Sequence, residues 1–145
     1  VACRAVLLAR PTDVAETRAL AATLAELARA GDLLLLSGDL GAGKTAFAQG
    51  FGRGLGIAEN ITSPTFTLAR EYQGERLRLH HLDVYRMEAM AEVFDVDLPE
   101  LLDDEAVVLI EWGEKFSSFS GRSDGEIAIE TLPGDERRIV LTLRP

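Results

Sequence analysis

The stretch LLLLSGDLGAGKT, residues 33–45, joins an apolar run to a glycine-rich segment. Four consecutive leucines, Leu33 to Leu36, are typical of a strand that is buried on both faces of a sheet. After the glycines, Phe47, Phe51 and Leu55 recur at helical spacing, which predicts a helix beginning near Lys44. A buried strand, a glycine-rich turn and an amphipathic helix therefore follow one another, and this order indicates an α/β fold.

The glycine-rich turn has the P-loop, or Walker A, spacing of Gly38, four residues, Gly43, Lys44 and Thr45. Glycines permit the tight turn and let successive backbone N–H groups face a chain of phosphates. The Lys44 ammonium would reach the β- and γ-phosphates, and the Thr45 hydroxyl would ligate Mg²⁺. The positive end of the helix dipole would face the same phosphates. The predicted nucleotide-binding residues are Gly38, Asp39, Leu40, Gly41, Ala42, Gly43, Lys44, Thr45, Ala46 and Trp112.

Composition limits the class of protein. A chain of 145 residues that is 47% hydrophobic predicts a single domain over residues 1–145. Cys3 is the only cysteine, so an intramolecular disulfide and a cysteine-based zinc site are excluded, which fits a reducing compartment. No apolar stretch approaches the length of a membrane span, and we expect a cytoplasmic protein without membrane contact. The net charge of −9 argues against unaided binding of nucleic acid, although a local arginine patch is compatible with it.

Patterns elsewhere in the chain predict further helices and strands. A helix is expected from Asp13, with Leu20, Leu24 and Leu27 as its apolar stripe and Gly31 at its end. Two hairpins are expected, 66–72 with 76–84 and 126–131 with 138–143, besides a strand at 106–110 and a helix over 87–102 broken near Pro99. Together these elements predict a P-loop NTPase fold of the α/β class, a three-layer sandwich with a mixed sheet and antiparallel hairpins.

Nucleotide hydrolysis also needs a carboxylate on a neighbouring strand to hold Mg²⁺. Glu111 ends the apolar run at 106–110, so it has the position of a Walker B acid. Ligands in such sheets bind at the carboxyl ends of the strands, where Glu111 is expected to lie. The alternative is an ordinary solvated glutamate at the end of a strand.

A second acid, Asp83, lies near the end of the segment RLRLHHLDVYR. Alternation places His81, Asp83 and Tyr85 on one face, so these polar residues would gather at the carboxyl end of the strand. Asp83 could instead cap the helix that follows. We interpret His81 as a hydrogen-bonded structural residue rather than a base. His80 points to the opposite face and has no assigned role.

Three further residues are candidates for the site. Thr65 has the position of a switch threonine that senses the γ-phosphate and Mg²⁺, with a turn hydroxyl as the alternative. Trp112 is the only tryptophan, and core packing is as plausible for it as nucleotide contact. Arg86 could stabilise charge in the transition state, unless a partner protein supplies that arginine.

The chain lacks both segments that Ras-type GTPases use. No aspartate has a glycine three residues later, which excludes DxxG, and Asn60 is the only asparagine and does not begin an NKxD segment. ATP is therefore the expected nucleotide. Two alternatives to an ATPase remain: a small-molecule kinase built on the same loop, and a nucleotide-gated binding module that does not hydrolyse.

Four segments, GDLGAGKT, SPTFTL, HLDVYR and IEWGEK, resemble in order and spacing the TsaE (YjeE) family, the small P-loop ATPase of bacterial tRNA threonylcarbamoyladenosine synthesis. The resemblance covers the chain from about Thr17 to Lys115. It implies an ATPase that works with TsaD and TsaB, the complex that transfers threonylcarbamoyl to an adenosine beside the anticodon. Contact with tRNA would be mainly indirect, which agrees with the acidic charge.

The resemblance also implies roles for single residues. Lys44 and Thr45 would bind phosphate and Mg²⁺, and Glu111 would be the metal-binding acid. Asp83 would be needed for hydrolysis. Thr65 matches the family's switch-like threonine and Trp112 the tryptophan beside its active site, whereas Gly113 replaces the proline of many relatives.

Overall fold

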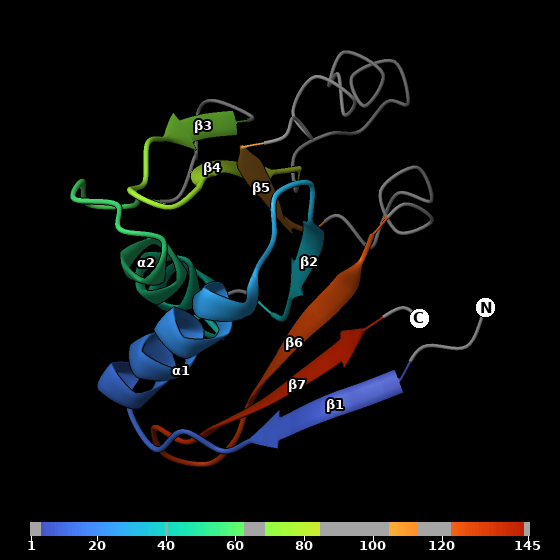
Figure 1. Ribbon diagram of the computed structural model, residues 1–145. Coiled ribbons are helices and arrows are strands. Elements are labelled where there is room, and N and C mark those ends of the chain that lie inside the picture. Colours follow the sequence, from blue (N-terminus) through green and yellow to red (C-terminus); the bar gives the residue numbers. More distant parts are fainter. Residues whose placement is uncertain (1–3, 40, 63–68, 85–104, 113–122, 144–145) are drawn as a thin grey trace.

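The computed structural model describes residues 4–39, 41–62, 69–84, 105–112 and 123–143 (Figure 1). These residues form seven strands and two helices. In chain order they are β1 (Arg4–Ala9), α1 (Val14–Leu27), β2 (Leu33–Ser37), α2 (Lys44–Gly54), β3 (Ala69–Tyr72), β4 (Arg78–Asp83), β5 (Ala106–Glu111), β6 (Gly125–Thr131) and β7 (Arg137–Leu143).

All seven strands belong to one sheet with the order β1-β7-β6-β2-β5-β4-β3. The four central strands, β6, β2, β5 and β4, are parallel to one another, whereas β7 and β1 at one edge and β3 at the other pair antiparallel. Every residue of β2 and β5 is buried, as their continuous apolar sequences predict for strands covered on both faces. The sequence prediction of an α/β fold with a mixed sheet is therefore confirmed.

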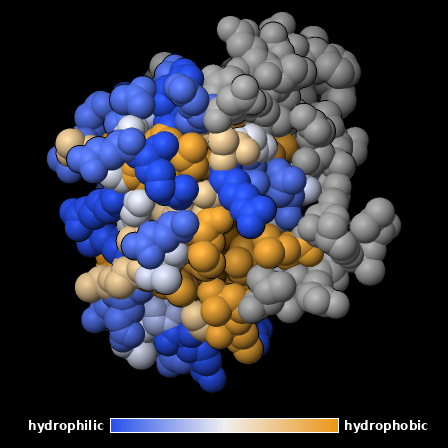
Figure 2. Space-filling model, viewed as in Figure 1, coloured by the Kyte–Doolittle hydropathy of each residue, from blue (hydrophilic) through white to orange (hydrophobic). Residues whose placement is uncertain are grey.

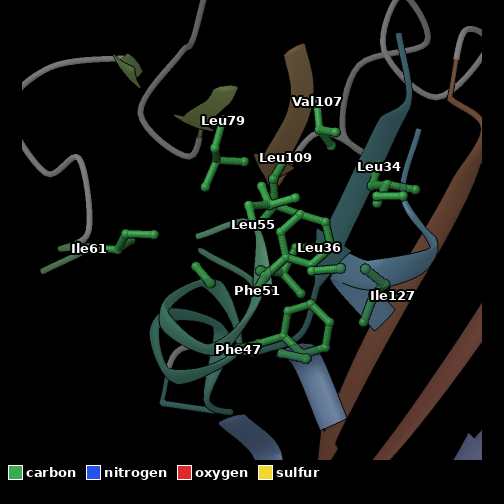
Figure 3. Close-up of a cluster of buried hydrophobic side chains, with 14 of the residues drawn as sticks. Leu34, Leu36, Phe47, Phe51, Leu55, Ile61, Leu79, Val107, Leu109 and Ile127 are labelled. Atoms are coloured by element: carbon green, nitrogen blue, oxygen red, sulfur yellow. The ribbon is translucent and has the colours of Figure 1, made fainter. Parts of the chain in front are cut away.

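The two helices lie side by side on one face of the sheet (Figure 1). Phe47 and Phe51 of α2 and Leu55 at its end are fully buried, as their helical spacing predicts. They pack with Leu34 and Leu36 of β2 (Figure 3). The helix expected over 87–102 lies outside the described residues.

Both predicted hairpins are present, as β3–β4 and β6–β7. The second hairpin is part of the central sheet, because β6 pairs in parallel with β2. Strand β1 was not predicted from the sequence. It pairs with β7 and extends this edge, although its register shifts between Ala5 and Leu7.

Helix α1 begins as predicted, since the Asp13 side chain accepts a hydrogen bond from the Glu16 N–H at 2.8 Å. The predicted leucine stripe was wrong in part. Leu27 is 73% exposed and Leu20 and Leu24 are only partly buried, whereas the buried residues of the helix are Thr17, Ala21 and Ala25. The helix also ends before Gly31, at Leu27.

Close contact between the helices explains why small residues are buried there. A Cβ added to Gly50 of α2 would lie 2.2 Å from the carbonyl oxygen of Arg18, and one added to Gly54 would lie 2.4 Å from that of Ala22. Leucines facing this contact would hold the helices apart. Leu24 and Leu27 instead line a groove between α1 and β7, where Figure 2 shows hydrophobic residues gathered at the surface.

Neither α1 nor α2, the helices in the described part of the chain, is long and apolar enough to cross a membrane.

Candidate active site

The loop between β2 and α2 has a backbone that requires glycine. Gly41 and Gly43 have φ values of +80° and +108°, in the left-handed region that other residues rarely adopt. At Gly38 a Cβ would lie 2.6 Å from the carbonyl oxygen of Ile129 on β6. The predicted glycine positions therefore serve two physical purposes, the turn itself and the close approach of the loop to the neighbouring strand.

Lys44 is the first residue of α2 and is only 6% exposed. Its ammonium donates a hydrogen bond to the carbonyl oxygen of Gly38 at 2.6 Å. The same nitrogen lies 3.4 Å from the centroid of the Trp112 ring, a cation–π contact. The ammonium of Lys44 therefore lies within the glycine loop, between the Gly38 carbonyl of the loop and the Trp112 ring.

Trp112 follows β5 and has φ +67°, the only positive φ among the described residues other than glycines. A bulky side chain is strained in this region, and such strain often marks functional positions. The ring is half-buried and lies against Lys44. This places Trp112 beside the phosphate loop, and its contact with nucleotide stays a prediction.

Glu111 is the last residue of β5 and is buried, with 3% of its surface exposed. The alternative of an ordinary solvated glutamate is therefore wrong. In the sheet register Glu111 stands between Leu36 of β2 and Asp83 of β4. Strand β2, which leads into the phosphate loop, pairs directly with β5, which carries this acid. Because the two strands are parallel, the loop and Glu111 lie at the same end of the sheet.

His81 lies on the same face of β4 as Asp83 and is fully buried. Its Nε2 is 2.6 Å from Oε2 of Glu111, and the two atoms share a hydrogen bond. The interpretation of His81 as a hydrogen-bonded residue is confirmed, and its partner is the predicted metal-binding acid. Its other ring nitrogen, Nδ1, has no hydrogen-bond partner among the described residues.

Asp83 ends β4 and is half-buried opposite Glu111 in the register. The structure therefore brings two carboxylates and an imidazole together at the carboxyl ends of adjacent parallel strands. Whether Asp83 caps a following helix is not tested, since residues 85–104 lie outside the described ones. Three predicted site residues also lie outside them: Leu40, Thr65 and Arg86.

One residue that supports the loop was not predicted from the sequence. Arg137, the first residue of β7, donates from Nε to the carbonyl oxygen of Ala42 at 3.0 Å. Ala42 is fully buried, and its own N–H donates to the Asp39 carbonyl at 3.0 Å. No local pattern marks Arg137, because it is separated from the loop by most of the chain and reaches it only through the pairing of β6 with β2.

The residues present fit a magnesium nucleotide. The Thr45 hydroxyl and the Glu111 carboxylate are oxygen donors, which Mg²⁺ prefers, and Lys44 supplies a buried positive charge for phosphate. The described residues contain no group of three or more His, Cys, Asp or Glu placed to hold a metal by themselves.

Comparison with known proteins identifies the relatives of this chain. The family described as "Threonylcarbamoyl adenosine biosynthesis protein TsaE" matches residues 11–139. The chain belongs to the TsaE family. A family member from Bacillus subtilis is 43% identical over 133 residues, covering 92% of this chain and 83% of that protein. One from Treponema pallidum is 42% identical and covers 77% of this chain and 82% of its own. Both are named tRNA threonylcarbamoyladenosine biosynthesis protein TsaE.

A solved structure supports the same assignment. The crystal structure of Bacillus subtilis YdiB superposes on this TsaE-family chain with a TM-score of 0.71 and 37% sequence identity. The match covers 99% of this chain and 88% of that one. The P-loop NTPase fold predicted from the sequence is therefore confirmed for this TsaE-family chain.

Proposed function

We propose that this chain binds ATP with Mg²⁺ and hydrolyses it. The observation that carries the proposal is that two buried charged residues follow adjacent parallel strands: Lys44 begins the helix after β2 and its loop, and Glu111 ends β5. A buried ammonium within a glycine loop suits a polyphosphate, and a buried carboxylate beside it suits the metal that accompanies ATP. ATP is the expected nucleotide because the guanine-binding segments are missing from the sequence.

Each residue has a distinct task in this mechanism. The Lys44 ammonium would exchange its Gly38 carbonyl partner for phosphate oxygens, while the loop N–H groups orient the phosphate chain. Thr45 and Glu111 would hold Mg²⁺, and the metal when bound neutralises charge on the phosphate oxygens. His81 would keep the Glu111 side chain in one orientation through their hydrogen bond.

The acid Asp83 would orient the attacking water, from its place beside Glu111 at the end of β4. Thr65 and Arg86, outside the described residues, are proposed to sense the γ-phosphate and to stabilise charge in the transition state.

We further propose that this ATPase supports TsaD and TsaB in the threonylcarbamoyladenosine modification of tRNA. The names of the relatives support the modification pathway. A net charge of −9 favours a division of labour in which the partners hold the tRNA. Hydrolysis by the chain alone should be slow, because an incomplete set of charges around the transferred phosphoryl group can lower the rate by about 10³ to 10⁵.

Isothermal titration calorimetry tests binding. Titration with ATP and Mg²⁺ should show saturable heat, and Lys44→Gln should weaken binding by about tenfold or more through loss of a charge-assisted contact. Asp135→Ala, in the exposed β6–β7 turn, is the control and should bind as the parent does. Parent protein that releases no heat with ATP would exclude a nucleotide site.

Phosphate release tests hydrolysis. The rate should rise when TsaD and TsaB are added, and Asp83→Ala should abolish the rise, whereas Asp135→Ala should leave it intact. Equal rates with and without the partners would contradict the proposed partnership. Nucleotide binding without turnover under both conditions would identify a nucleotide-gated module, and ADP formation that depends on a small hydroxyl acceptor would identify a kinase.

A further inference from the structure

A pocket of about 480 Å³ is lined by residues of α1, α2 and the loop 57–62 that follows α2. None of the described residues that line it belongs to the phosphate loop. It begins at Gln49, one helical turn or about 6 Å along the axis from Thr45. Its polar lining consists of Arg18, Gln49, Arg53, Glu59, Asn60 and Thr62.

Hydrogen bonds hold one wall of this pocket in place. Nε and Nη2 of Arg18 both donate to Oε1 of Gln49, at 3.2 and 3.0 Å. The amide nitrogen of Gln49 donates in turn to the carbonyl oxygen of Ile61 at 3.1 Å. Gln49 therefore fixes the plane of the Arg18 guanidinium and ties it to the loop. The remaining nitrogen of Arg18, Nη1, makes no hydrogen bond with the residues that the structure describes.

A second guanidinium lines the same pocket. Arg53 is exposed and lies one helical turn after Gln49 on α2. Its side chain has no hydrogen bond or ion pair with any residue in the described ranges. Among the lining residues that the structure describes, Glu59 is the one carboxylate, and it too forms no ion pair there. Among the described residues, neither Arg18 nor Arg53 is neutralised by a carboxylate, so both positive charges can face an anion in this pocket.

We propose that this pocket binds a small molecule through one oxyanion group, a phosphate or a carboxylate. The planar guanidinium presents paired N–H donors that match the two oxygens of such a group. Arg18, held by Gln49, and Arg53 would supply the charge-assisted hydrogen bonds. Asn60 and Thr62 would add a neutral amide and a hydroxyl.

Charge and shape favour a small ligand over nucleic acid. An extended polyanion would meet the negative field of the whole chain, whereas a single oxyanion in a pocket interacts mainly with the guanidinium groups beside it. The aliphatic part of the lining, Ile57, Ala58 and Ile61, would face the rest of such a molecule.

Nuclear magnetic resonance spectroscopy can separate this pocket from the phosphate loop, which is itself expected to bind phosphate. Inorganic phosphate and sodium acetate are titrated separately into the full chain, and the amide signals of residues 57–62 are followed apart from those of residues 38–45. Saturable shifts in 57–62 are expected, and the anion that produces the lower Kd there identifies the oxyanion class.

Arginine variants assign the site. Arg53→Gln should raise the Kd fitted to residues 57–62 by about tenfold or more, with no change in the Kd fitted to residues 38–45. Arg18→Gln should do the same, and Arg29→Gln, an equal loss of charge on an exposed residue elsewhere, should have no effect. Since Arg53 is exposed, its variant is informative even if Arg18→Gln does not fold. The proposal fails if residues 57–62 show no saturable shift with either anion, or if Arg53→Gln binds as tightly as the parent.

Discussion

The contact between α1 and α2 can be tested by adding a single methyl group. Gly50 is buried in α2, and in a helix interior the change from glycine to alanine normally stabilises by about 1 kcal/mol. Here the added Cβ would lie 2.2 Å from the Arg18 carbonyl oxygen and 2.6 Å from its Cα. Ordinary C···O contacts are about 3.3 Å or longer, so the helices would have to separate by about 1 Å.

The magnitude follows from these two opposing effects. Overpacking costs about 1 to 3 kcal/mol, and the upper value applies at Gly50 because a backbone carbonyl cannot rotate away. After the gain in helix propensity, Gly50→Ala should lower the free energy of unfolding by about 2 kcal/mol. For a chain of this size, that corresponds to a fall in Tm of about 4 to 8 °C.

Gly52→Ala is the matched control on the same helix. Its Cβ would lie 2.1 Å from Cδ1 of Ile61, the end of a flexible side chain, and its next contact is at 3.3 Å. A rotamer adjustment costs about 0.5 to 1.5 kcal/mol, which the helix propensity of alanine offsets. Urea denaturation should therefore leave Gly52→Ala within about 1 kcal/mol of the parent. If Gly50→Ala proves as stable as Gly52→Ala, the close contact of the helices is refuted.

Three further predictions concern single side chains. Burial raises the pKa of Asp32 above its ordinary value of 3.8. The folded state disfavours the ionised carboxylate, so stability is lost as the pH rises through the folded-state pKa. Asp32→Asn should therefore increase the free energy of unfolding at pH 7, and this increase should shrink as the pH falls toward 3.8. Urea denaturation at pH 7 and near pH 3.8 measures the increase, and an equal increase at both would contradict this. His81→Leu should cost about 1.5 to 3 kcal/mol of stability by leaving buried Glu111 without its hydrogen bond, and adding Glu111→Gln should restore part of that loss. Strict additivity of the two substitutions would show that the pair is not coupled. Trp112→Gly should be about 1 kcal/mol more stable than Trp112→Ala, since only glycine adopts φ +67° without strain, and equal Tm values would argue against that backbone geometry.

Local sequence determined the elements that build the site. Four leucines in a row are sufficient to predict a strand buried on both faces, and β2 is buried throughout. The positive φ values of Gly41 and Gly43 agree with a turn that only glycine permits, and the helix begins at Lys44 as its spacing predicts. These features depend on backbone preferences and short-range periodicity, both of which are properties of neighbouring residues.

Tertiary structure alone decided which side chains meet and which faces are buried. Leu27 belongs to a regular apolar stripe yet is exposed, because the close approach of α2 selects alanines for the contact. The hydrogen bond of His81 to Glu111 joins residues on separate strands, and that of Arg137 to Ala42 spans most of the chain. Such contacts follow from the order and register of the strands, which are set by the packing of the whole sheet and leave no periodic signal in the sequence around either partner.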